Sequence, residues 1–410
     1  MLASILVLLV AGLAAGWLAE RLHVPDIVVY LVVGIALGPA VAGWLQAPAG
    51  SVASQLVFVA GAALLLYEGG REMRLHEVRR VWLTLTLLST VGVLAGALVV
   101  AGIGAWLLHL PFTMALLLAA VLSPTDPASI VPLLRHVAVT PKLAQTVVGE
   151  SALNDATAAT IAVAVLAVMS GGNVVWWKGG LNFATSSVGG LAIGAAVAAA
   201  TAFAVSGALG RAPRPIREER GPILALVTAL GAYLIADRVG ASGFMAVFAA
   251  GVIHGNRGVF RLLPPESRVQ PSEQGFMAVT GHLMRMAIFV LLGTQIDFGS
   301  LLGDLWPAAL LTLTLVILAR PVTVLVSALP DRRARWTWPE LGFLIWVRET
   351  GVVAAVLAGI LASRGVPGAP LISSTVVLAA LVTLLLQGST TAAVARRLGV
   401  GARVAEPLNQ

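Results

Sequence analysis

The feature that most constrains this chain is a succession of apolar segments, each long enough to cross a lipid bilayer. A membrane-spanning helix needs about 20 mainly apolar residues, and the clusters of Gly, Pro and charged residues divide the sequence into about thirteen such segments. Only 11% of the residues are charged, against roughly 25% in soluble domains. The sequence therefore predicts an all-α polytopic membrane protein, with residues 1–410 forming a single integral membrane domain.

The predicted spans are 1–19, 26–45, 51–69, 82–108, 111–134, 142–170, 181–209, 221–237, 241–256, 276–296, 304–329, 338–363 and 371–395. Lys and Arg alternate between the loops: 20 fall after odd-numbered spans or in the tail, and 3 after even-numbered spans. Because loops rich in Lys and Arg stay in the cytoplasm, we expect an external amino terminus and a cytoplasmic carboxyl terminus in a cell membrane. The same distribution explains the net charge of +7 without a nucleic-acid partner.

The first apolar run is interpreted as a membrane span rather than a signal peptide, because it lacks a basic region ahead of it and its charges, Glu20 and Arg21, follow it. The chain contains no cysteine, which excludes disulfides and thiolate metal sites. Neither a His-Glu-x-x-His motif nor an Asp-rich diphosphate motif is present. We therefore expect no cofactor and no enzymatic activity, although a membrane-embedded enzyme stays as a remote alternative.

Seven charged residues fall inside the predicted spans, and they point to function. Each charge costs about 3 kcal/mol at the bilayer centre when it faces lipid, so these side chains must face protein or water. The acids outnumber the arginines that lie deepest, which suits a bound cation or protons. The seven residues are Asp126, Glu150, Asp155, Arg285, Arg320, Arg348 and Glu349.

The fifth span is predicted to contain a broken helix. Asp126 lies between Pro124 and Pro127, and each proline removes a backbone donor and opposes a continuous helix. Transporters place such interrupted helices at mid-membrane, where the released backbone groups line an ion site. The alternative is a simple proline kink that is capped by Thr125 and Asp126.

The sixth span carries two polar stripes. Ser151 and Asp155 are i,i+4 neighbours on one face, and Glu150 and Asn154 form a second stripe about 100° around the helix. One face can meet an ion while the other meets a positive partner. The alternatives are a structural ion pair for Asp155 and ordinary interhelical hydrogen bonds for Ser151 and Asn154.

The counter-charges for these acids lie far along the chain, at Arg320 and Arg348. The fifth and twelfth spans cross in opposite directions, and each has a polar interruption at mid-membrane, which is the pattern of an inverted repeat with two broken helices. Glu150 is expected to form a structural ion pair chiefly with Arg320, since the fixed fork of an arginine suits a buried carboxylate. Arg348 is the alternative partner.

Several motifs resemble those of one known family. "SPTDP" is followed about two dozen residues later by "GESALNDATA", and "LHVPDIVVYLVVGIALGP", "ARPVTV" and "VRETGVVA" occur in the matching order. Together they are similar to the monovalent cation/proton antiporters, in the branch of the NhaP-type prokaryotic Na⁺/H⁺ antiporters and the eukaryotic Na⁺/H⁺ exchangers. The resemblance implies thirteen spans, a homodimer and an elevator-like motion. It also implies a core around 82–170 and 304–397 and a dimerisation part around 1–69 and 181–296.

The resemblance also implies roles for individual residues. Asp155 would bind the cation or the proton, Asn154 would be its motif partner, and Thr125 and Ser151 would supply further ligands for Na⁺. Asp126 would be a charge of the broken helix. The Asn-Asp pair implies electroneutral exchange of one cation for one proton.

The chain departs from the family pattern at one point in the twelfth span. Glu349 and Thr350 follow Arg348 where many relatives have Gly-Ala, so both are candidate modulators of ion preference. The expected activity is exchange of Na⁺ or Li⁺ for H⁺. A K⁺/H⁺ antiporter or a K⁺ efflux system of the same superfamily is the nearest alternative; such efflux systems usually add a cytoplasmic nucleotide-binding domain, which is not found in these residues.

Overall fold

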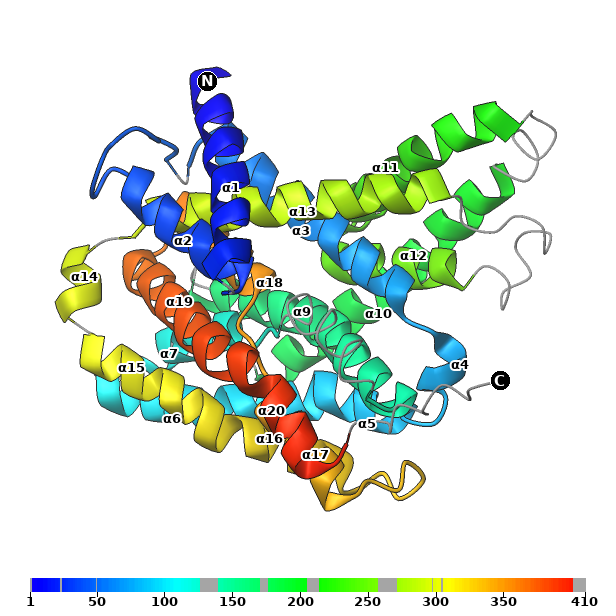
Figure 1. Cartoon of the computed structure of the whole chain (residues 1–410). Helices are drawn as coiled ribbons and strands as arrows, with labels where there is room; N and C mark the ends of the chain where they lie inside the picture. The colour runs from blue at the N-terminus through cyan, green and yellow to red at the C-terminus, as the bar shows by residue number, and fades with distance from the viewer. Residues whose placement is uncertain are drawn as a thin grey trace, which may run out of the picture.

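The computed structural model describes residues 2–22, 24–48, 50–125, 139–169, 176–204, 214–256, 271–296, 298–303 and 305–400. These residues are almost entirely helical (Figure 1). By length and hydropathy, nine of the described helical segments can cross a membrane: Ser4–Leu22, Val52–Glu72, Trp82–Leu108, Pro141–Met169, Leu181–Phe203, Arg220–Arg238, Glu273–Thr294, Leu305–Ala328 and Ala369–Leu398. Four shorter apolar helices are Asp26–Leu37, Phe112–Leu122, Gly243–Gly255 and Val352–Ser363. The chain is a multi-pass membrane protein.

Each predicted span overlaps one of these helices, while thirteen crossings stay a prediction. One helix ends earlier than expected: the span predicted over 26–45 is helical only to Leu37, because Gly38 and Pro39 follow. The span predicted over 111–134 is interrupted, as expected, because α7 ends at Leu122, ahead of Pro124. Residues 126–138 lie outside the described part of the chain.

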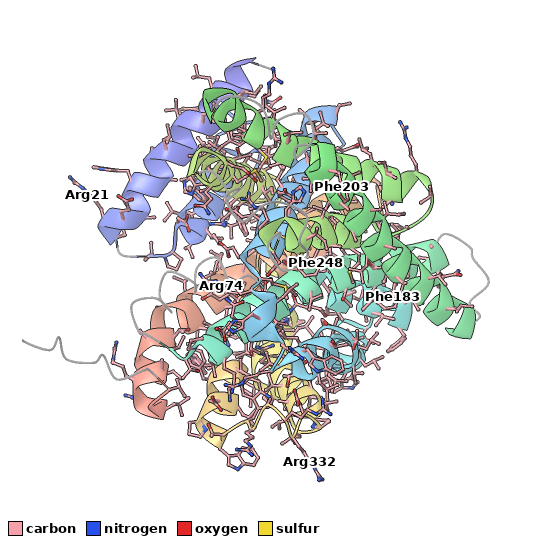
Figure 2. The ribbon with its side chains drawn as sticks, turned by 90° about the vertical axis from the view of Figure 1, so that its right-hand side faces the viewer. Arg21, Arg74, Phe183, Phe203, Phe248 and Arg332 are labelled. Atoms are coloured by element: carbon pink, nitrogen blue, oxygen red, sulfur yellow. The ribbon has the colours of Figure 1, made fainter. Side chains whose placement is uncertain are left out.

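One group of helices, here called the first group, combines the early and middle parts of the sequence. In it α3 packs against α12 and α13, α12 packs against α10 and α11, and α13 packs against α2. The members are α1 (Leu2–Leu22), α2 (Asp26–Leu37), α3 (Val52–Glu72), α10 (Trp176–Ala204), α11 (Arg214–Arg238), α12 (Gly243–Gly255) and α13 (Pro271–Thr294). Phe248 of α12 is buried in a cluster with Met73, Val81 and Leu85, whereas Arg21 and Arg332 extend from the periphery (Figure 2).

Glycines allow the helices of the first group to approach closely. Gly251 and Gly255 lie four residues apart on α12, and a Cβ atom there would stand 2.2 and 2.3 Å from the carbonyl oxygens of Tyr67 and Arg71 on α3. Small residues at this spacing let membrane helices meet backbone to backbone. A side chain at either position would therefore separate α3 from α12.

The second group of helices surrounds the two interrupted spans. Here α6 packs against α7 and α15, α7 packs against α9, and α16 packs against α17. The members are α5 (Trp82–Leu87), η1 (Leu88–Gly92), α6 (Val93–Leu108), α7 (Phe112–Leu122), α9 (Pro141–Met169), α15 (Leu305–Thr314), η3 (Leu315–Ala319), α16 (Arg320–Ala328), α17 (Trp338–Trp346), α18 (Val352–Ser363), α19 (Ala369–Thr383), η4 (Leu384–Gly388) and α20 (Ser389–Leu398). Short helices α4 (Leu75–Val78) and α14 (Phe298–Gly303) lie in connections.

Three long helices of the second group each contain one π-helical turn, namely η1, η3 and η4. A π turn inserts an extra residue into an α-helix and is frequent at functional sites. The first group meets the second where α9 packs against α3 and α12 and where α18 packs against α3 and α13.

The twelfth predicted span is broken in the middle. The helix α17 begins at a capping box formed by Thr337 and Glu340 and ends at Trp346. Residues 347–351 are non-helical, and α18 then begins at Val352. In the fifth span, α7 ends at Leu122 and residues 123–125 are non-helical. These two non-helical stretches meet, and the candidate site lies where they do.

Candidate functional site

The helix α9 positions four polar residues in the membrane interior. It is helical from Pro141 to Met169, so the two stripes expected from the sequence are present on neighbouring faces. Glu150, Ser151 and Asn154 are buried, with exposures of 3%, 2% and 2%, and Asp155 is half-buried. Because Glu150, Ser151 and Asn154 are withdrawn from lipid and bulk water, each needs a partner in the protein or in a bound ion.

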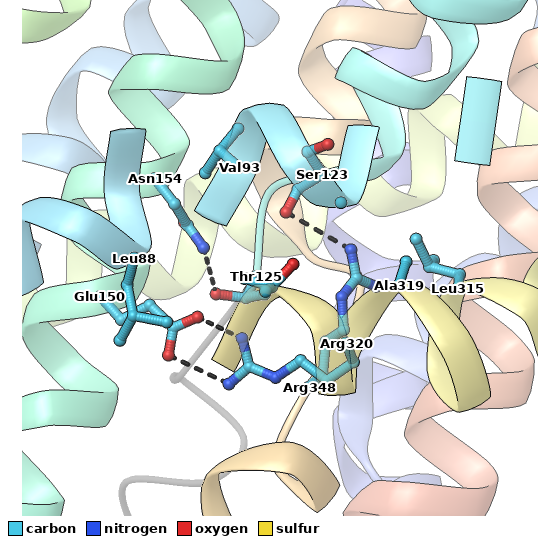
Figure 3. Close-up of a pocket in the computed structure, with 12 residues that line it drawn as sticks. Leu88, Val93, Ser123, Thr125, Glu150, Asn154, Leu315, Ala319, Arg320 and Arg348 are labelled. Carbon is cyan, nitrogen blue, oxygen red and sulfur yellow. Dashed lines mark hydrogen bonds and ion pairs between the residues drawn. The ribbon is translucent and has the colours of Figure 1, made fainter. Parts of the chain in front are cut away.

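Glu150 forms a two-pronged ion pair with Arg320 (Figure 3). Arg320 Nη1 donates to Glu150 Oε1, and Nη2 donates to Oε2 at 3.0 Å. The same guanidinium donates through Nε and Nη2 to the carbonyl of Leu344, at 2.9 and 2.7 Å, and through Nη2 to that of Val347 at 3.1 Å. Arg320 thus joins α9 to the end of α17, where the carbonyls lack partners within the helix.

Thr125 joins the end of the interrupted fifth span to α9. Ser151 Oγ donates to the Thr125 carbonyl, and Asn154 Nδ2 donates to Thr125 Oγ1 at 2.8 Å (Figure 3). The structure thus brings Thr125 to Ser151 and Asn154, which follow it by 26 and 29 residues in the sequence. Both polar stripes of α9 therefore contribute to the contact with Thr125.

Arg348 serves the other helix end. Its Nη2 donates to the carbonyl of Leu122 at 2.8 Å. It also donates to that of Ser123 at 3.4 Å (Figure 3). These carbonyls close the carboxyl end of α7, where the helix dipole favours a positive charge. The two arginines therefore have different partners: Arg320 binds the Glu150 carboxylate, and Arg348 caps α7.

A small cavity lies between these groups, with room for little more than a water-sized species. Two of the π turns border it, η1 through Leu88 and η3 through Ala319. Asn154 Oδ1 and Arg348 Nη1, both buried, have no hydrogen-bond partner among the described residues. The lining residues are Leu88, Val93, Gly96, Ser123, Thr125, Glu150, Asn154, Leu315, Ala319, Arg320, Thr323 and Arg348.

The other predicted residues in the described part of the chain are not among those that line this cavity. Asp155 follows Ser151 by one turn of α9 and is not among the residues that line it. Asp126 lies outside the described residues. Glu349 and Thr350 follow Arg348 in the non-helical segment and are fully buried, and Arg285 lies on α13 in the first group. The sequence did not predict a role for Thr323, Ser123 or the π turns. Of these, Ser123 lies in a motif that the sequence offered, as the first residue of "SPTDP", and Thr323 lies in "ARPVTV".

A comparison with protein families identifies the family of this chain. The family model described as the transmembrane part of sodium/hydrogen exchangers matches residues 5–397. The chain belongs to the sodium/hydrogen exchanger family. The resemblance that the motifs predicted is thereby confirmed.

Individual members of the exchanger family are similar along most of this chain. The K(+)/H(+) antiporter NhaP of Alkalimonas amylolytica is 27% identical over 396 residues, which are 96% of this chain and 66% of that protein. The low-affinity Na(+)/H(+) antiporter NhaS1 of Synechocystis is 26% identical, over 95% of this chain and 73% of its own length. The chain thus spans just under two thirds of the Alkalimonas relative.

The fold also matches a solved member of the family. The sodium proton antiporter MjNhaP1 from Methanocaldococcus jannaschii superposes with a TM-score of 0.78 at 24% identity, covering 97% of each chain. At this identity the similarity establishes the fold.

Proposed function

We propose that this protein exchanges a monovalent cation for H⁺ across a cell membrane, with Asp155 as the carboxylate that the two ions share. The observation that carries the proposal is the attachment of α9 to the interrupted end of α7, through Ser151 and Asn154 to Thr125. In transporters, irregular backbone at membrane depth lines ion sites. Membership in the exchanger family supports this assignment.

The hydrogen bonds leave oxygen lone pairs available around α9. Ser151 uses its proton on the Thr125 carbonyl, and Thr125 Oγ1 accepts from Asn154, so each hydroxyl oxygen keeps a lone pair. Oxygen atoms are the ligands that alkali-metal cations meet in protein sites. Ser151 and Thr125 therefore join Asp155 as proposed ligands, while Asn154 holds Thr125 in place. Asp126, in the same motif, is proposed as a further charge of the broken helix.

Competition follows from a single shared carboxylate. The deprotonated Asp155 attracts the cation, and the protonated form no longer does, so loading one ion expels the other. Because Asn154 is uncharged, one positive charge moves in each direction, and we propose electroneutral exchange. Clamping the membrane potential of proteoliposomes with valinomycin is expected to leave the direction and extent of exchange unchanged.

We propose Na⁺ or Li⁺ as the cation, with K⁺ as the alternative. The relatives differ in the cation for which they are named: the Alkalimonas protein is named a K⁺/H⁺ antiporter and the Synechocystis protein a Na⁺/H⁺ antiporter. Fluorescence of a pH-sensitive dye inside proteoliposomes, with NaCl, LiCl or KCl added at equal ionic strength, separates the two. Proton movement with none of the three salts would contradict the proposed function.

The wider mechanism is proposed from the arrangement of the two helix groups. The second group would form the moving core, and the first group would form the dimerisation part of a homodimer in contact with membrane lipids. The α9 contacts with α3 and α12 are then the surface along which an elevator-like motion takes place. We propose an external amino terminus and a cytoplasmic carboxyl terminus, as the distribution of Lys and Arg predicts.

A further inference from the structure

The cavity beside α9 is bordered by two buried polar atoms of opposite hydrogen-bonding character. Asn154 Oδ1 is an acceptor and Arg348 Nη1 is a donor, and neither has a hydrogen-bond partner among the described residues. Asn154 is 2% exposed and Arg348 is 5% exposed, so bulk solvent does not satisfy them. Both residues line the same cavity, one from α9 and the other from the non-helical segment after α17 (Figure 3).

The remaining bonds of these two side chains leave only those atoms unpaired. Asn154 Nδ2 donates to Thr125 Oγ1 at 2.8 Å, so the amide oxygen is the end without a partner. Arg348 Nη2 donates to the carbonyl of Leu122 at 2.8 Å, which leaves Nη1. An unpaired donor and an unpaired acceptor are each destabilising in a buried site. A species that accepts from one and donates to the other would remove both costs.

The size of the cavity restricts its occupant. Its volume is about 20 Å³, and one water molecule needs about 10–15 Å³ on this measure. The π turn η1 contributes Leu88 to the wall, and η3 contributes Leu315 and Ala319. These side chains are apolar, so any polar contact with an occupant comes from the other lining residues. A single water fits, and a hydrated ion does not.

The groups in the wall favour water over a bare ion. A cation would suit Asn154 Oδ1 but would face the positive guanidinium of Arg348. An anion would accept from Arg348 Nη1 but would leave Asn154 Oδ1 beside a negative charge and without a donor. The carboxylate of Glu150, which also lines the cavity, is already paired with Arg320. Water alone both accepts and donates.

Two hydroxyl groups in the wall offer acceptors for the second proton of a water. Ser123 Oγ donates to the carbonyl of Ala119 at 2.7 Å, and Thr323 Oγ1 donates to that of Gly92 at 3.1 Å. Because each hydroxyl proton is used in this way, each oxygen keeps lone pairs. Buried waters typically make about three hydrogen bonds, and the lining of this cavity can supply that number.

We propose that this cavity binds one ordered water molecule, which links Arg348 to Asn154 and makes Arg348 a positioning residue for the Thr125 hydroxyl. Asn154 then holds both interrupted spans to α9. Its Nδ2 bonds to Thr125 of the fifth span, and its Oδ1 is joined through the water to Arg348 of the twelfth. The water site is independent of the proposed function, whereas its effect on cation affinity rests on that function, because Thr125 is a proposed ligand.

A high-resolution structure of the full-length chain tests the water site directly. Density is expected in the cavity at about 2.7–3.2 Å from both Asn154 Oδ1 and Arg348 Nη1. Crystals grown with rubidium or bromide salts provide the control, because both ions scatter anomalously and water does not. An anomalous peak in the cavity would overturn the assignment to water. Absence of density there, in a map that shows other buried waters, would overturn it as well.

A pair of double-variant cycles tests the link in the folded protein. Arg348→Gln is combined with Asn154→Leu, and in the matched control with Ser151→Ala. Ser151 also bonds to Thr125 but does not line the cavity. If the water joins Arg348 to Asn154, the losses in melting temperature are less than additive for the first pair and additive for the second. Additive losses in both cycles would contradict the link.

Arg348→Lys covers the case in which these variants fail to fold. It keeps the positive charge but replaces the fork that reaches α7 and the water together. The half-saturating cation concentration is expected to rise about threefold, as for the loss of one hydrogen bond, with the maximal rate retained. A lower yield of folded protein with an unchanged half-saturating concentration would show a merely structural role. Wild type that shows the water but exchanges no cation would instead count against the proposed function.

Discussion

Two buried polar clusters in this protein differ in how completely their hydrogen bonds are formed. The first, here called the histidine cluster, lies in the first helix group and consists of Tyr67, Thr201, Thr228 and His254. The second lies around α9 and consists of Thr125, Glu150, Ser151, Asn154 and Arg320. Both join helices that are distant in sequence.

The histidine cluster is a closed network. Tyr67 Oη lies 2.5 Å from His254 Nδ1, and His254 Nε2 lies 3.1 Å from the Ala198 carbonyl. A carbonyl only accepts, so Nε2 carries the proton and Nδ1 of the neutral ring accepts from Tyr67. Thr228 Oγ1 lies 3.1 Å from Thr201 Oγ1, which in turn lies 3.2 Å from Nε2. A closed network of this kind specifies how α3, α10, α11 and α12 pack.

The α9 cluster is incomplete on one side. The carboxylate of Glu150 is held by both prongs of Arg320, whereas Asn154 Oδ1 has no partner among the described residues and borders a cavity. Complete networks stabilise a fold, and a buried group that still lacks a partner marks a place for a ligand or water. The completeness of the hydrogen bonds thus distinguishes residues that stabilise the fold from residues that are proposed to bind an ion.

The largest expected effect is at Asp155. Asp155→Asn removes the charge that cation and proton share, so exchange in proteoliposomes is expected to be abolished. The melting temperature should stay near that of wild type, since this side chain is half-buried and is not part of the pair with Arg320. Robust Na⁺ flux driven by a pH gradient in this variant would contradict the proposed role.

The next effect concerns stability. Glu150→Gln or Arg320→Gln alone leaves one buried charge without its counter-charge, which typically costs roughly 3–5 kcal/mol. The double variant removes both charges and is expected to recover much of that loss. Thermal unfolding of the wild type, both single variants and the double variant measures the coupling. A cycle with Arg348→Gln in place of Arg320→Gln is the control, and stronger coupling there would identify Arg348 as the energetic partner of Glu150.

A smaller effect is expected at Thr125. Thr125→Val keeps the side-chain shape but removes the hydroxyl that accepts from Asn154 and is proposed to meet the cation. The apparent affinity for the cation is expected to fall about tenfold, or about 1.4 kcal/mol. Half-maximal proton release over a series of Na⁺ concentrations gives the value. An unchanged affinity would remove Thr125 from the proposed ligands.

The smallest effect is expected in the histidine cluster. Tyr67→Phe removes one hydrogen bond to His254, which is worth about 1 kcal/mol of stability, and leaves α9 untouched. The melting temperature is expected to fall modestly with no change in cation affinity. A change in affinity as large as that of Thr125→Val would show that the contrast between the two clusters is not one of structure against ion binding.

Much of the α9 site could be anticipated from the sequence. The i,i+4 spacing of Ser151 and Asp155 fixes their common face once the segment is helical, and the high cost of membrane-embedded charge predicts that Glu150 needs a positive partner. Each predicted span also overlaps a described helix, because length and hydropathy suffice to define spans. Local chemistry of this kind is readable from short stretches of residues.

The sequence by itself determined that this chain enters a membrane as helices, that its acids avoid lipid, and that its motifs belong to one family. Only the tertiary structure decided that Arg320 holds Glu150 while Arg348 caps α7, since both arginines fall inside predicted spans and the choice depends on helix packing across 170 residues. It also decided where the π turns fall and that Glu349 meets Gly388. Such contacts join segments whose distance and rotation no local pattern specifies.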